Sequence, residues 1–129
     1  QSNMSIRSVF DDIDRCIEAY KLSGFIAESQ VTFDFRVNTG FVRGTLTFTD
    51  GAQLHFREFL ADSGDTTEKL DYSYHYQMAD ASLVFRYDNA NHRPSLGFVN
   101  HKHTPEVIIA ASQVSPQEVL DEIYHLLTP

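Results

Sequence analysis

Residues 41–60 decide the fold, and they read FVRGTLTFTDGAQLHFREFL. Asp50-Gly51 is a hairpin turn signal. On either side of it, at 41–49 and 52–60, apolar and polar side chains alternate, which is typical of β-strands with one buried face. The stretch therefore predicts an antiparallel β-hairpin.

The register of this hairpin determines which side chains share a face. A loop of three residues, at 50–52, would place Leu46 opposite Phe56 and Phe48 opposite Leu54, which makes one face apolar. A two-residue loop would mix the two faces, so we predict the longer loop. The polar face of the hairpin would then carry Thr45, Thr47, His55 and Arg57.

The rest of the chain adds further strands and a helix at each end. Apolar residues between Met4 and Leu22 recur at helical spacing, and Ser23-Gly24 ends that pattern. Ser115-Pro116-Gln117-Glu118 has the N-cap, proline and glutamate that open a C-terminal helix. Alternation predicts further strands at 25–36, 69–77, 83–88 and 106–110. We expect an α+β fold: an antiparallel sheet of about five or six strands, with both helices packed on one face.

Composition indicates one compact domain without disulfides. The chain has 129 residues, 42% of them hydrophobic and 22% charged, which excludes disorder, collagen-like repeats and coiled coils. We take residues 4–129 as a single domain and residues 1–3 as the remnant of an expression tag. The single cysteine, Cys16, allows no intramolecular disulfide. No apolar run approaches the ~20 residues of a membrane span, so we expect a cytoplasmic protein.

The charge of the chain is unevenly distributed. The formal net charge of -8 repels RNA phosphates and anionic membranes, so any contact with nucleic acid needs a local cationic patch. Residues 83–103 reverse the balance: they hold three cationic side chains against Asp88 alone, together with three histidines. These side chains are Arg86, Arg93, Lys102, His92, His101 and His103.

The polar face of the predicted sheet is the candidate site. Strand alternation would place on it His55, Arg57, His75, Arg86 and Asp88. The long segment 89–104 would bring His92, His101, Lys102 and His103 within reach. Arginine and lysine hold phosphate, and histidine transfers protons, so this combination suits a phosphate-handling site. The alternative is a sheet face that simply contacts water.

A metal site is a second possibility in the same region. His101-Lys102-His103 could place two imidazoles on one side of an extended segment, where His92 or His75 could complete a site for zinc or another transition metal. Neither a second cysteine nor a His/Glu helix motif accompanies them. We therefore predict no resident metal and no cofactor. The sequence also has no Walker loop, dinucleotide fingerprint or Gly-x-Ser-x-Gly elbow.

Four stretches of the chain form a recognisable series: FTDGAQLHFRE at 48–58, YSYHYQ at 72–77, FRYDNA at 85–90 followed by His92, and HKH at 101–103. Together they resemble the TumE-like toxin family of prokaryotic toxin-antitoxin pairs. The resemblance runs from about Gly44 to the end of the C-terminal helix. It implies a small cytoplasmic toxin that a neighbouring, DNA-binding antitoxin neutralises. The family pattern makes candidates of His75, Arg86, Asp88, His92, His101 and His103.

From these residues we predict a metal-independent endoribonuclease. His75 or His101 would take the 2′-hydroxyl proton, and His92 or His103 would protonate the leaving oxygen. The remaining roles fall to Arg86 and Lys102 for the phosphorane charge, Asp88 for orienting an imidazole, and His55 and Arg57 for substrate binding. RNA, the ribosome and a second copy of the chain are candidate partners beside the antitoxin. The alternatives are a protein-binding module without catalysis and a metal-dependent hydrolase that uses His92, His101 and His103.

Overall fold

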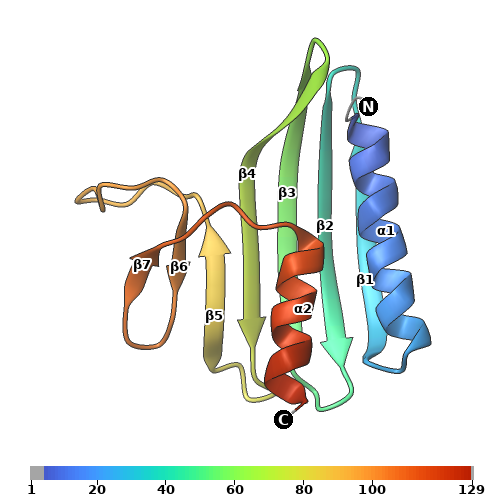
Figure 1. The fold of residues 1–129 in the computed structure, drawn as a ribbon, viewed down its shortest axis with the longest axis vertical. Coiled ribbons are helices and arrows are strands. Elements are labelled where there is room, and N and C mark those ends of the chain that lie inside the picture. Colours follow the sequence, from blue (N-terminus) through green and yellow to red (C-terminus); the bar gives the residue numbers. More distant parts are fainter. Residues whose placement is uncertain (1–4, 129) are drawn as a thin grey trace.

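A computed structural model describes residues 5–128, with one β-sheet and two helices on the same face of that sheet (Figure 1). Residues 1–3, the expected tag remnant, lie outside the described residues. In chain order the elements are α1 (Ile6–Leu22), β1 (Ile26–Phe35), β2 (Thr39–Phe48), β3 (Gln53–Ser63), β4 (Thr66–Gln77), β5 (Leu83–Asp88), β6 (His101–His103), β7 (Ile108–Ala110) and α2 (Pro116–Leu127).

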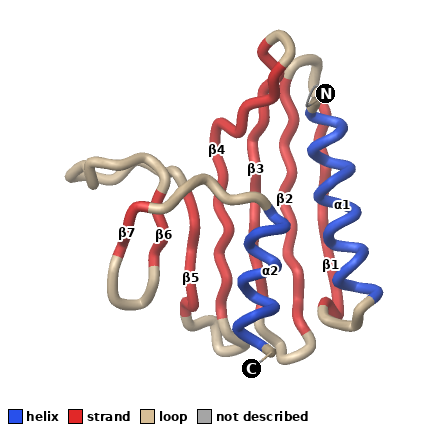
Figure 2. Tube along the Cα trace, in the orientation of Figure 1, coloured by secondary structure: helices blue, strands red, loops and turns tan. Residues whose placement is uncertain are grey.

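The sheet is a meander in which each strand pairs with the next one along the chain (Figure 2). It has seven strands, all antiparallel, so the α+β class is confirmed but the expected count of five or six is too low. The unexpected strand is β6, which lies within the long segment 89–104, where the sequence predicts no strand. Three residues are too few to show a period in the sequence. β6 forms because it pairs with both β5 and β7.

The core lies between the sheet and the helices. Helix α1 contributes a stripe of buried side chains at the predicted spacing, and α2 contributes Val119, Leu120 and Ile123. Three tyrosines of β4, Tyr72, Tyr74 and Tyr76, are almost fully buried on the same face. Each helix begins with a capping box, at Ser5 and at Ser115, which satisfies backbone N–H groups of the first turn. Both helices of the described chain lie on this face, so neither covers the opposite face of the sheet (Figure 1).

The β2–β3 hairpin has the predicted faces but a different register. Leu46 pairs with Leu54 rather than Phe56, and the loop of three residues is at 49–51 rather than 50–52. The reason is Gly51, whose φ of +88° suits glycine at the last loop position, where Ala52 would be strained. A shift of two residues leaves every side chain on its predicted face, because side chains alternate with a period of two.

A second difference concerns the acidic segment 61–67, which lies between the predicted strands at 52–60 and 69–77. Strand β3 continues to Ser63 and β4 begins at Thr66, so only Gly64 and Asp65 form the turn. Gly64 has a φ of +66°, which a tight hairpin turn favours. The segment is polar because both strands extend beyond the helices into solvent, not because it is irregular.

Gly40 allows α1 to pack closely on β2, and its replacement tests that packing. A Cβ at this position would lie 2.5 Å from Ile6 Cγ2 and 2.9 Å from Phe10 Cζ. We expect Gly40→Ala to lower the free energy of unfolding by about 1–3 kcal/mol, because the first turns of α1 must move off the sheet. Urea unfolding measures the change. Thr32→Ala, on an exposed strand position, should change it by less than about 0.5 kcal/mol. Equal effects of the two substitutions would contradict the prediction.

Candidate functional site

The sheet face without helices carries two rows of polar side chains that run across neighbouring strands. Residues directly opposite one another in successive strand pairs define each row. The first row is Thr45, His55, His75, Arg86 and His103. The second row is Arg43, Arg57, Ser73, Asp88 and His101. Nine site residues were predicted from the sequence. Seven of them lie in these two rows, His92 lies beside them, and Lys102 points to the opposite face.

A cavity of about 650 Å³ opens on this face; we call it the open-face cavity. Its ionisable lining consists of three guanidinium groups and two imidazoles, from Arg43, Arg57, Arg86, His55 and His75. Among the described residues, no aspartate or glutamate lines it. The cavity is therefore a cationic patch on an acidic protein, which is the kind of surface that a phosphate group requires.

Sequence reasoning missed Arg43, Ser73 and Gln77 as lining residues. Arg43 lies two residues before Thr45 on the same strand, so the alternation that identified the polar face already placed it there. Ser73 and Gln77 flank His75 at the same spacing. All three could have been found from strand alternation, because each lies two residues from a residue already placed on the polar face.

His75 is held in a neutral form by its neighbours. Its Nδ1 lies 3.4 Å from Arg86 Nη1, which can only donate, and its Nε2 lies 3.1 Å from the carbonyl Oε1 of Gln77, which can only accept. We assign the proton to Nε2, which leaves a lone pair on Nδ1. Burial lowers the pKa of His75, and the nearby charge of Arg86 lowers it further. A neutral imidazole can act as a general base at Nδ1 once a substrate hydroxyl replaces Arg86 as the donor to that nitrogen.

His55 lies beside His75 on the neighbouring strand. The centroids of the two rings are 6.4 Å apart, and both imidazoles line the open-face cavity. The Nδ1 of His55 is 3.0 Å from the hydroxyl of Thr45, which fixes the ring in the first row. The cavity therefore presents two imidazoles to one ligand.

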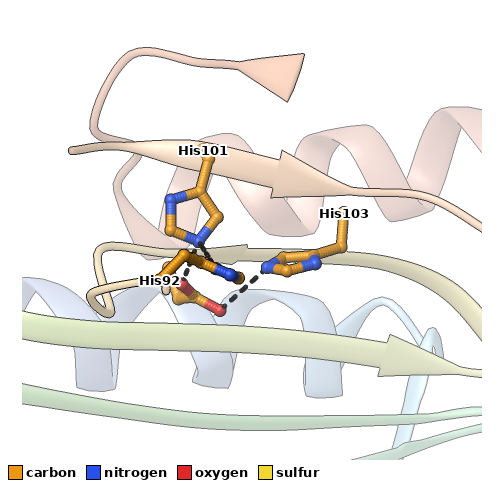
Figure 3. A group of neighbouring side chains, drawn as sticks. His92, His101 and His103 are labelled. Carbon is orange, nitrogen blue, oxygen red and sulfur yellow. Dashed lines mark hydrogen bonds and ion pairs between the residues drawn. The ribbon is translucent and has the colours of Figure 1, made fainter. Parts of the chain in front are cut away.

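Asp88, His92, His101 and His103 form a second group, which we call the Asp–His cluster (Figure 3). One potential ligand atom from each of the four lies within 4.8 Å of all the others. The closest approaches are 2.6 Å from His101 Nε2 to Asp88 Oδ1 and 3.0 Å from His101 Nε2 to His92 Nε2. Asp88 and His101 are buried, whereas His92 and His103 are half-buried. The long segment after β5 carries His92 back onto the end of that strand.

Asp88 connects the cluster to the open-face cavity. Its Oδ2 accepts a hydrogen bond of 2.6 Å from Arg86 Nε, and its Oδ1 accepts one of 3.1 Å from the backbone N–H of Ala90. Burial favours the neutral acid, but these hydrogen bonds and the adjacent cationic groups outweigh it, so the pKa of Asp88 lies below its usual value. The carboxylate therefore stays charged and holds Arg86 in place.

Two of the predicted roles do not fit these positions. Lys102 points to the helix face, where its Nζ lies 2.7 Å from Glu122 Oε2 and over the ring of Tyr87, because consecutive strand residues point to opposite faces. It cannot stabilise a phosphate bound beside Arg86. His101 is on the expected face but is fully buried, so it cannot take a proton directly from a 2′-hydroxyl group.

A family model described as toxin TumE matches residues 13–128. The chain belongs to the TumE toxin family. The match covers all seven strands, and with them the open-face cavity and the Asp–His cluster, and it confirms the resemblance seen in the sequence. Searches of curated proteins and of solved structures found no match. TumE membership makes the chain a toxin component, which in general implies an antitoxin partner. Within residues 5–128, no helix combines the length and apolar character needed to span a membrane.

Proposed function

We propose that this TumE-family toxin cleaves RNA in the open-face cavity without a metal ion in the reacting step. The observation that carries the proposal is the lining of that cavity, where three arginines and two histidines face one space. Two of the arginines also pair with carboxylates outside the lining, Arg86 with Asp88 and Arg57 with Asp71. Guanidinium groups bind phosphate through paired hydrogen bonds, and imidazoles transfer protons near neutral pH. The chain as a whole has a net charge of -8, which disfavours RNA binding outside this cationic patch.

The reaction that suits this geometry is transfer of the phosphoryl group to the neighbouring 2′-oxygen. His75 takes the 2′-hydroxyl proton at Nδ1, and the 2′-oxygen forms a bond to phosphorus. Arg86, next to that nitrogen, stabilises the negative charge on the phosphorane. The bond from phosphorus to the 5′-oxygen breaks, and protonated His55 donates a proton to that oxygen. The products are a 2′,3′-cyclic phosphate and a 5′-hydroxyl end.

This assignment moves the general acid from His92 or His103 to His55. The reason is position: His55 lines the open-face cavity together with His75, whereas His92 and His103 lie in the Asp–His cluster beyond Asp88. Arg57 remains a substrate-binding residue. Its Nε lies 3.3 Å from Asp71 Oδ2, so the guanidinium group of Arg57 would bind this carboxylate and a phosphate at the same time. We also propose that the antitoxin is a DNA-binding protein.

Induced expression in a bacterial host tests the proposal. Wild type is compared with the double variant His75→Ala/Arg86→Ala, and total RNA is sequenced for new 5′-hydroxyl ends. We expect growth arrest and discrete new ends with wild type only. Arrest without new ends would overturn RNA cleavage, and absence of arrest would favour the protein-binding module.

The pKa of His75 gives a test of the general base that needs no substrate. We expect Arg86→Gln to raise this pKa, because the neutral amide removes the charge that disfavours the imidazolium. The pKa of His75 should still lie below its ordinary value in this variant, because burial is the largest of the effects that lower it and is unchanged. Titration of the His75 ring protons by nuclear magnetic resonance measures it. Arg36→Gln, at an exposed arginine outside the cavity, should leave the pKa of His75 unchanged. A pKa that does not move in Arg86→Gln would contradict the pairing of these two side chains.

A further inference from the structure

The Asp–His cluster has the donor atoms and spacing of a metal site. We propose that Asp88, His92, His101 and His103 together bind one divalent transition-metal ion, with Zn²⁺ as the best match. A tetrahedral Zn²⁺ site with bonds of about 2.0–2.1 Å has ligand atoms about 3.3 Å apart. In the cluster, His101 Nε2 lies 2.6 Å from Asp88 Oδ1 and 3.0 Å from His92 Nε2, and His103 Nε2 lies 3.5 Å from Asp88 Oδ2. One ligand atom of each of the four residues lies within 4.8 Å of the others, so small side-chain shifts would reach the spacing of a zinc site.

The contacts of His101 determine which ring atom faces the cluster. Its Nδ1 lies 2.8 Å from the carbonyl oxygen of Val99, which can only accept, so Nδ1 donates to that oxygen. Its Nε2 faces the cluster, 2.6 Å from a carboxylate oxygen of Asp88 and 3.0 Å from Nε2 of His92. Three atoms that can each ligate a cation therefore lie together, two of them on buried side chains.

The groups around the cluster match the outer shell of a metal site. A metal-binding histidine usually donates its other N–H to a backbone carbonyl or a carboxylate, as His101 does to Val99. A ligating carboxylate is in turn hydrogen-bonded, as Asp88 is by Arg86 and Ala90. Three imidazoles with one carboxylate suit Zn²⁺ and its first-row neighbours better than Mg²⁺ or Ca²⁺, which prefer oxygen ligands.

The bound ion would connect three parts of the chain. Asp88 ends β5. His92 belongs to the long segment after that strand, and His101 and His103 are on β6 (Figure 3). The ion would fix that segment to the sheet edge and hold Asp88 where its second oxygen meets Arg86. This is a positioning role. His55 and His75, the proposed acid and base, are not ligands, so the inference holds whether or not the protein cleaves RNA.

Metal content and zinc affinity of the purified protein test the site. The protein is prepared without an affinity tag, stripped with chelator, dialysed and titrated with Zn²⁺ alone in a calorimeter. We expect one ion per chain. His92→Ala should weaken zinc binding by more than the ~100-fold that outer-shell substitutions cost, because it removes a ligand. His125→Ala removes an exposed histidine on α2 outside the cluster and should bind zinc as wild type does.

Thermal unfolding gives a second readout. Excess Zn²⁺ should raise the melting temperature of wild type and of His125→Ala but not of His92→Ala. Circular dichroism checks that His92→Ala, which alters a half-buried side chain outside the strands, keeps its fold. Equal zinc binding by wild type and His92→Ala would overturn the proposal. RNA cleavage without zinc binding would overturn the metal site alone, and zinc binding without cleavage would overturn the proposed function alone.

Discussion

Arg86→Ala is expected to abolish growth arrest and to lower RNA cleavage by about 10²–10³-fold, the usual loss when one group that stabilises a transition-state charge is removed. Arg86 has this effect because of its position. Its Nη1 lies 3.4 Å from the proposed base His75, and its Nε donates to Asp88. It is the side chain that joins the open-face cavity to the Asp–His cluster.

Two further variants separate a role in the reaction from a role in folding. Arg36→Ala removes an exposed arginine that also pairs with an aspartate, and it should arrest growth as wild type does. Arg86→Lys keeps the charge but cannot bind Asp88 and a phosphate through one planar group, so we expect only partial recovery. Melting temperatures show whether each variant is folded. Growth arrest that persists when the Arg86→Ala variant is folded would contradict the assignment of Arg86 to the site.

Alternation in the sequence was sufficient to place six of the seven strands and to assign the faces of the β2–β3 hairpin. The β2–β3 register was wrong by two residues, yet His55 and Arg57 lie on the predicted face, because only an odd shift exchanges the faces. Local pattern failed at β6, where three residues carry no period and pairing with β5 and β7 imposes the strand. Secondary structure with too few residues to show a pattern depends on its neighbours in space.

The site could be predicted where it depends on strand alternation. Alternation places His75 on one face of its strand and Arg86 on the same face of the next strand, so these two side chains were grouped correctly. His101-Lys102-His103 was assigned to one site as a unit, although the period places the central lysine on the opposite face from the two histidines. The sequence offered either His92 or His75 as the partner of His101 and His103, and the path of a segment without regular structure decides for His92. The Asp–His cluster is therefore a tertiary feature that the sequence only suggested.

Lys69→Met is expected to lower the free energy of unfolding by about 3–5 kcal/mol, because it leaves a buried carboxylate without its cation. Glu58 is fully buried on the helix face of β3, and its Oε2 lies 3.2 Å from Lys69 Nζ and accepts a hydrogen bond from the Tyr74 hydroxyl. Lys69 also donates to the carbonyl of Val114, at 2.8 Å, which ties β4 to the chain before α2. Among the described residues, Glu58 Oε1 has no hydrogen-bond partner, so Lys69 is the main compensation for this charge.

Urea unfolding of two further variants shows whether the loss comes from the unpaired charge. Lys21→Met breaks an exposed pair with Glu18, and it should cost no more than about 1 kcal/mol. The double variant Glu58→Gln/Lys69→Met should be more stable than Lys69→Met alone, because the neutral amide needs no cation. If Lys69→Met lowers the free energy of unfolding no more than Lys21→Met does, then groups other than Lys69 stabilise the Glu58 carboxylate. If instead the double variant is the less stable of the two, the lysine acts through its packing and its bond to Val114 rather than through charge.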